Sequence, residues 1–227
     1  APYMLPVIDR FTEFFAEHHI ETVCADVRER LEEEELLPLV GDIDGVICGD
    51  DRLTDRVMAA APRLKVISKW GTGIDSIDQV AAKRHGIAVC NTPDAFTFPV
   101  ADSVLGYMLC FARQLPWMDR EIKAGRWQKI QGFALRESTL GIIGVGHVGQ
   151  EIVRRAISFG VRVIGHDVAT IPPSFVSETG LEVVGKKELL EQSDFVTLNC
   201  DLNSSSHHII GAAELELMMA TAFLINT

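Results

Sequence analysis

Short β-branched runs alternate with amphipathic stretches along most of this chain, and no other feature limits its possible folds so strongly. The alternation is typical of parallel strands joined by crossover helices, because a parallel neighbour requires a connection that returns to the start of the sheet. It therefore predicts an α/β protein built on parallel sheets. The expected strands are residues 21–24, 45–48, 65–69, 87–90, 139–144, 161–167, 194–199 and 222–226.

The apolar stretch 97–112 separates the two sets of strands and is long enough for about four helical turns. Pro116 follows it, and a second helical stretch ends near Gly125. We therefore expect two parts, residues 1–96 and 97–227, with a helix at the junction that bridges them or buries a subunit contact. Other expected helices are residues 9–17, 29–37, 54–60 and 76–85.

Composition narrows the class of protein. The chain has 227 residues and is 47% hydrophobic, enough for a substantial core. Its 21 basic and 32 acidic residues give a net charge of −11, which opposes binding to nucleic acid. No window of 18 uncharged apolar residues occurs, so we expect a cytoplasmic protein without a membrane partner. Five cysteines without a CxxC pair favour a reducing compartment, and we expect them to be small buried hydrophobic residues.

A glycine motif follows one of the most apolar expected strands. Gly144, Gly146 and Gly149 form GxGxxG at the start of a helical stretch, and a second strand ends in Asp167. In this context Gly144 would allow a tight turn, Gly146 would let a pyrophosphate approach, and Gly149 would let the helix pack closely. The helix N-terminus then offers free N–H groups to phosphate.

Asp167 indicates which dinucleotide is bound. Its carboxylate can accept hydrogen bonds from both adenosine ribose hydroxyls, and it would repel a 2′-phosphate. Its neighbours His166 and Val168 provide no arginine to offset that repulsion. NAD is therefore favoured over NADP; the alternative is a glycine-rich turn with an unrelated surface aspartate.

A second glycine turn, at Gly71, Thr72 and Gly73, also lies between an expected strand and an expected helix. Its successive N–H groups can hold a carboxylate or phosphate. An ordinary strand-to-helix turn capped by Asp75 explains the pattern equally well. Lys69 either adds positive charge there or is simply solvated at the strand end.

None of the seven histidines is a convincing catalytic base. His147 lies inside the first glycine turn, where it would flank phosphate. No His, Cys, Asp or Glu cluster has the spacing of metal ligands, so no metal site is expected.

Several motifs in this order resemble the NAD-dependent D-2-hydroxyacid dehydrogenases, in particular the phosphoglycerate dehydrogenase branch. The resemblance implies a flavodoxin-like substrate-binding lobe up to about residue 96 and a Rossmann nucleotide-binding lobe after it. It also implies an oxidoreductase that acts on a small 2-hydroxy or 2-oxo acid and forms a homodimer through the nucleotide lobe. The motifs are residues 65–78, 91–93, 100–102, 112–116, 125–127, 139–149, 198–202 and 224–227.

The resemblance also assigns individual residues. The backbone of Gly71, Thr72 and Gly73 is expected to hold the substrate carboxylate, with Lys69 nearby. The residues expected at NAD are Gly144, Gly146, His147, Val148, Gly149, Asp167, Asn199, Cys200, Asn226 and Thr227.

The family's three catalytic groups, an arginine, a glutamate and a histidine, are expected beyond Thr227. The arginine follows the Asn–Thr pair of the family by two positions, so Asn226 and Thr227 place it just outside the sequence. Both ends of the chain look cut: a first strand of the substrate lobe and the rest of the nucleotide lobe are expected to be missing.

One loop departs from relatives that act on 3-phosphoglycerate, which carry an Arg–Ser pair there. Here the loop contains Gly49, Asp50, Asp51 and Arg52. Two carboxylates oppose a phosphorylated substrate unless Arg52 turns inward. A glyoxylate, glycerate or hydroxypyruvate type of substrate is therefore an alternative, as is an NAD(H)-sensing regulator without catalytic activity.

Overall fold

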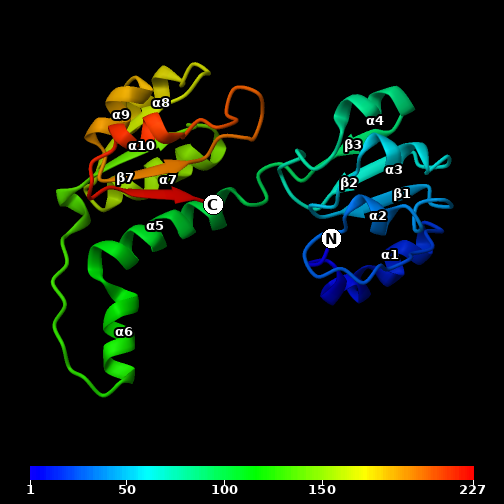
Figure 1. The fold of residues 1–227 in the computed structure, drawn as a ribbon, viewed down its shortest axis with the longest axis horizontal. Helices are drawn as coiled ribbons and strands as arrows, with labels where there is room; N and C mark the ends of the chain where they lie inside the picture. The colour runs from blue at the N-terminus through cyan, green and yellow to red at the C-terminus, as the bar shows by residue number, and fades with distance from the viewer. The chain divides into compact units, whose positions relative to one another are not determined.

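The computed structural model describes residues 1–227 and has an α/β fold with two parallel sheets, which confirms the predicted fold class. The chain forms two compact units, Ala1–Ala95 and Phe96–Thr227. Figure 1 shows a separate sheet in each unit. No helix combines the length and the apolar character needed to cross a membrane.

The first unit has a three-stranded parallel sheet in the order β1-β2-β3, with each strand beside the next in the sequence. Helices between these strands make the crossovers that parallel pairing requires. All three strands therefore end at the same edge. The elements are η1 (Leu5–Phe11), α1 (Thr12–Glu17), α2 (Glu33–Leu36), β1 (Gly45–Cys48), α3 (Asp55–Ala59), β2 (Val66–Lys69), α4 (Gln79–His85) and β3 (Ala88–Cys90).

Residue types at the helix ends explain where the two crossover helices begin and end. Thr54 caps α3 by accepting from the Val57 amide, and Asp78 caps α4 by accepting from the Ala81 amide. Gly86 ends α4 with a left-handed φ of 71°. The apolar faces of both helices pack on Cys48 and Ile67 in one core.

The second unit contains a five-stranded parallel sheet in the order β6-β5-β4-β7-β8. From β4 the chain first builds one side of the sheet and then returns to build the other side from β7. This reversal beside β4 is the switch point at which doubly wound folds bind ligands. The elements are α5 (Thr97–Arg113), α6 (Leu115–Lys123), η2 (Leu135–Glu137), β4 (Thr139–Ile143), α7 (His147–Ser158), β5 (Arg162–His166), α8 (Pro173–Thr179), β6 (Glu182–Val183), α9 (Lys186–Gln192), β7 (Phe195–Leu198), α10 (Ala212–Leu217) and β8 (Phe223–Asn226).

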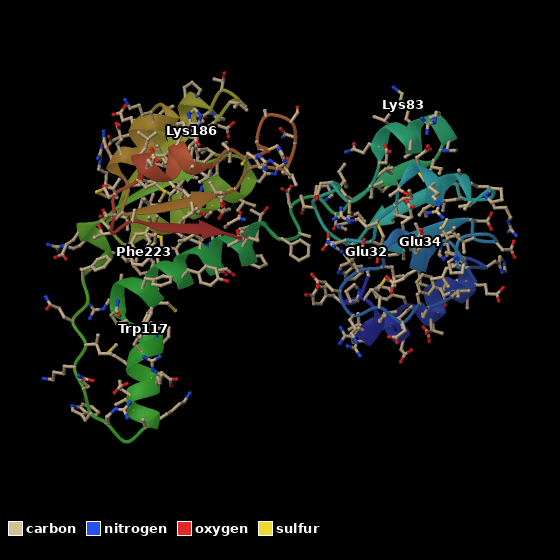
Figure 2. The ribbon with its side chains drawn as sticks, viewed as in Figure 1. Glu32, Glu34, Lys83, Trp117, Lys186 and Phe223 are labelled. Carbon is tan, nitrogen blue, oxygen red and sulfur yellow. The ribbon has the colours of Figure 1, made fainter.

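Stacked aromatic rings hold the long helix α5 against the β7–β8 edge of this sheet. The ring centroids of Phe111 on α5 and Phe223 on β8 are 4.6 Å apart, and those of Phe223 and Phe195 on β7 are 5.1 Å apart. Trp117 on α6 continues the contact, with its ring centroid 5.7 Å from that of Phe111. Figure 2 labels Trp117 and Phe223. The aromatic column therefore links α6 to the edge of the sheet.

Helix α6 and the extended residues 126–133 form an arm of the second unit (Figure 1). Helix α6 has no buried residue. The arm returns to its unit at Gly132, where a Cβ would lie 2.4 Å from the Ala112 carbonyl oxygen. Only glycine allows the backbone to approach α5 so closely at this point.

The structure differs from several predictions made from the sequence. Residues 21–24 form no strand and are mostly exposed, and the helix expected over 29–37 contracts to α2. We named no elements for the region that forms α8, β6, α9 and α10. The expectation of buried cysteines holds for Cys48 but fails for Cys24, Cys90 and Cys200, which are exposed.

Candidate functional site

The residues predicted to bind the cofactor lie together at the carboxyl ends of the strands of the second sheet. Gly144 follows β4, Asp167 follows β5, Asn199 follows β7 and Asn226 ends β8. Because these four strands are parallel neighbours, their carboxyl ends lie side by side. The Asn199 amide also donates to the Ile143 carbonyl over 2.8 Å, which fixes the start of one loop beside the glycine turn.

Each of the three glycines meets a different steric requirement. Gly144 has a φ of 90°, and a Cβ on it would lie 2.8 Å from the Cys200 nitrogen. A Cβ on Gly149 would lie 2.2 Å from the Gly144 carbonyl oxygen, so only glycine lets α7 approach the turn. Gly146 precedes α7, and a Cβ there would meet no atom within 4 Å. Its surroundings are open, as the approach of a pyrophosphate requires.

The Asp167 carboxylate is fixed by two backbone donors. The Val145 amide donates to Oδ2 over 2.6 Å, and the Ala169 amide donates to Oδ1 over 2.8 Å. A carboxylate has about four acceptor positions, so each oxygen can still accept a ribose hydroxyl. The residues present therefore fit a dinucleotide with an unmodified 2′-hydroxyl.

The other four residues predicted at the cofactor are Val148, Cys200, Thr227 and His147. The Val148 side chain is partly buried and packs against the core. Cys200 is exposed as a residue, but its thiol is partly buried. This burial is the largest cause of a pKa above the usual value, and the nearby carboxylates of Asp201 and Asp167 raise the pKa further. The thiol is therefore protonated at neutral pH. Thr227 is exposed beyond β8, and His147 is the first residue of α7.

The second predicted site lies at the carboxyl ends of the strands of the first unit. The Gly71 amide donates to Thr92 Oγ1 over 2.9 Å, and the Thr92 amide donates to the Gly71 carbonyl over 2.9 Å. Asn91 Nδ2 donates to the Thr72 carbonyl over 2.8 Å. The amides of Thr72 and Gly73 donate no hydrogen bond within the protein, so both can bind an anion. We did not single out Asn91 and Thr92 as supports of this turn, although their position after the neighbouring strand could have shown it.

Lys69, at the end of β2, is not solvated, which excludes one of the two interpretations of this residue. Its side chain is only 5% exposed, and Nζ donates to the Gly49 carbonyl over 2.6 Å and pairs with Asp50. Arg52 does not compensate for the two acidic residues before it. Its half-exposed guanidinium lies 4.0 Å from the carboxylate of Glu32, so its charge already has a partner outside this loop.

Comparison with known proteins agrees with this arrangement. The family model for the NAD binding domain of D-isomer specific 2-hydroxyacid dehydrogenases matches residues 105–227. The chain belongs to this family. Relatives include D-3-phosphoglycerate dehydrogenase of Methanocaldococcus jannaschii, which is 38% identical over 88% of this chain. Glyoxylate reductase of Thermococcus onnurineus is 34% identical over 92% of this chain.

A solved structure, the TT0316 protein from Thermus thermophilus, has a TM-score of 0.83 and 31% identity, and the match covers 96% of this chain and 70% of that one. The chain spans 39% of the phosphoglycerate dehydrogenase and 65% of the glyoxylate reductase. The predicted cofactor, NAD, is confirmed by the family of the second unit.

Two alanine substitutions separate folding from cofactor binding. Gly149→Ala should lower the free energy of unfolding by about 2–3 kcal/mol, because its Cβ would collide with a backbone oxygen. Gly146→Ala should change it by less than about 1 kcal/mol, yet weaken NADH binding at least about tenfold by filling the approach to the pyrophosphate. Urea unfolding and NADH fluorescence titration measure the two effects. Unchanged NADH affinity in Gly146→Ala would contradict the assignment.

Replacing Asp167 tests the choice of cofactor. Asp167→Asn should weaken NADH binding about tenfold, because the amide oxygen cannot serve both backbone donors and the ribose. It should also narrow the preference for NADH over NADPH, because the charge that repels the 2′-phosphate is lost. Isothermal titration with both cofactors measures this. Asp119→Asn removes one charge from an exposed pair with Lys123 and should leave both affinities unchanged.

Proposed function

We propose that this chain belongs to an NAD-dependent dehydrogenase that acts on the CH–OH group of a D-2-hydroxy acid. The observation that carries the proposal is the open glycine turn beside the fixed Asp167 carboxylate, at the switch point of the second sheet. Family membership supports the same reaction class. The split of the relatives between phosphoglycerate dehydrogenase and glyoxylate reductase leaves several small acids as candidate substrates.

The residues of this chain would bind and orient the reactants. Bound NAD supplies the hydride acceptor. The N-terminal turn of α7 and Gly146 would hold its pyrophosphate, and Asp167 would hold the adenosine ribose. Asn199 and Cys200 would line the adenosine side, and Asn226 and Thr227 the nicotinamide side.

The amides of Thr72 and Gly73 would bind the carboxylate of the substrate, because they are two donors with no partner in the protein. The hydrogen bonds from Asn91 and Thr92 hold the turn in place, so little ordering is needed on binding. By resemblance, an arginine, a histidine and a glutamate beyond Thr227 would perform the proton transfer.

Turnover of 2-oxo acids by the full-length protein tests this function. We expect NADH oxidation, followed at 340 nm, with glyoxylate or hydroxypyruvate, and slower oxidation with 3-phosphohydroxypyruvate because of the acidic loop at Asp50 and Asp51. NADH binding without turnover of any 2-hydroxy or 2-oxo acid would contradict the enzyme and leave an NAD(H)-sensing regulator.

We also propose that the second unit forms a homodimer through α5 and the arm. Apolar side chains are exposed along this surface, including Tyr107 on α5, Ile122 on α6 and Trp127, which is 84% exposed. Exposed apolar surface of this kind is typical of a protein interface. An arm that leaves its own unit with no buried residue also gains stability when a second copy covers it.

Light scattering after size-exclusion chromatography tests the dimer. The wild-type protein should elute with the mass of two chains, and Trp127→Glu should shift it to one chain, because a charge would be buried at the interface. Val80→Glu changes a side chain that is 78% exposed on α4 of the first unit and should leave the dimer intact. A monomeric wild type would contradict the proposal.

A further inference from the structure

Lys69 is a buried cation whose role is not explained by the fold alone. It is the last residue of β2, and its side chain is enclosed at the carboxyl end of the first sheet. A buried charge requires a partner and hydrogen bonds, since desolvation is costly. The loop after β1 provides both, through the Gly49 carbonyl and the Asp50 carboxylate.

This loop lies directly beside the turn with the two free amides. The Trp70 amide donates to the Cys48 carbonyl over 2.8 Å, and Leu53 forms a parallel bridge with Ile77. The Lys69 Cε is 3.2 Å from the position that a Cβ on Gly71 would occupy. The Lys69–Asp50 pair is therefore adjacent to the proposed carboxylate site.

The charged groups of the loop after β1 are paired with one another or with neighbouring groups, and the amino group of Ala1 lies 3.9 Å from the Asp51 carboxylate. Asp50 neutralises Lys69, while Asp51 is buried and accepts from the amides of Leu31 and Gly49 over 2.7 and 2.8 Å. Asp75 Oδ1 lies 3.2 Å from the Cβ position of Gly73. A single substrate carboxylate can be held by the backbone amides, but a second anionic group on the same substrate would meet no unpaired cation in this loop.

We propose that Asp50 determines substrate specificity by neutralising Lys69, so that the site accepts 2-hydroxy acids with an uncharged tail and rejects those with a second anionic group. This inference rests on the proposed function and names its substrate class. The carboxylate of Asp50 is itself 73% exposed, so its main structural partner is the lysine rather than the core. Its removal would leave the ammonium free to attract an anionic tail.

Binding of a matched pair of acids tests the proposal. D-Glycerate and D-3-phosphoglycerate differ only in a phosphate. Calorimetric titration into the full-length protein saturated with NADH, with which neither hydroxy acid can react, gives both Kd values. The wild type should bind D-glycerate more tightly. Asp50→Asn should shift the ratio of the two Kd values roughly tenfold towards the phosphorylated acid, and this shift should shrink at high salt.

Two further variants distinguish charge from shape. Asp42→Asn removes an equal charge at the opposite end of β1, where Asp42 pairs with Arg63, and should leave the ratio unchanged. The double variant Asp50→Asn with Lys69→Met removes both charges and should restore the wild-type ratio. Tighter binding of D-3-phosphoglycerate by the wild type, a ratio unaffected by Asp50→Asn, or no binding of either acid would overturn the inference.

Failure of the proposed function gives a different result. It would be seen as an absence of NADH oxidation with every 2-oxo acid, in wild type and Asp42→Asn alike. The Kd ratio does not depend on turnover, so the specificity assigned to Asp50 is judged separately from catalysis.

Discussion

The backbone contact between Gly149 and the Gly144 carbonyl is the constraint on which the cofactor site depends. A Cβ at Gly149 would lie 2.2 Å from that oxygen, so no other residue lets α7 begin so close to the end of β4. This approach directs the N-terminus of α7 towards the switch point. The same turn places the Val145 amide on Asp167, so the phosphate and ribose sites share one rigid piece of backbone.

In both candidate sites, the groups proposed to bind an anion differ from the groups proposed to select among ligands. Backbone amides, at the start of α7 and at Thr72 and Gly73, would provide the proposed anion sites, and such sites depend little on side-chain identity. Side-chain charges would then select the ligand: in our proposals Asp167 disfavours a 2′-phosphate, and Asp50, which pairs with Lys69, disfavours a second anionic group on the substrate. A fold can therefore keep its anion sites while its substrate changes, which is consistent with relatives of different named activities.

Local sequence patterns predicted most of the fold and the glycine turn at the carboxyl end of β4. The strand before Gly144 and the glycine spacing are contiguous signals, because strand, turn and helix follow each other directly in the sequence. Residues 21–24 have β-branched character but gain no neighbouring strand, and pairing rather than propensity decides whether a strand forms. The short strand β6 was not predicted, for a related reason: it consists of two residues, and both form their pairs with β5.

Long-range pairing explains what the sequence could not predict about the substrate site. Lys69 and Asp50 are 19 positions apart, and the parallel register of β1 and β2 brings their loops together. A lysine at a strand end is most often solvated, and only the Gly49 carbonyl and the Asp50 carboxylate make burial of this one favourable. What a buried charge attracts depends on whether another charge is already paired with it, and this pairing is the reason for our proposal that the loop after β1 favours an uncharged substrate tail.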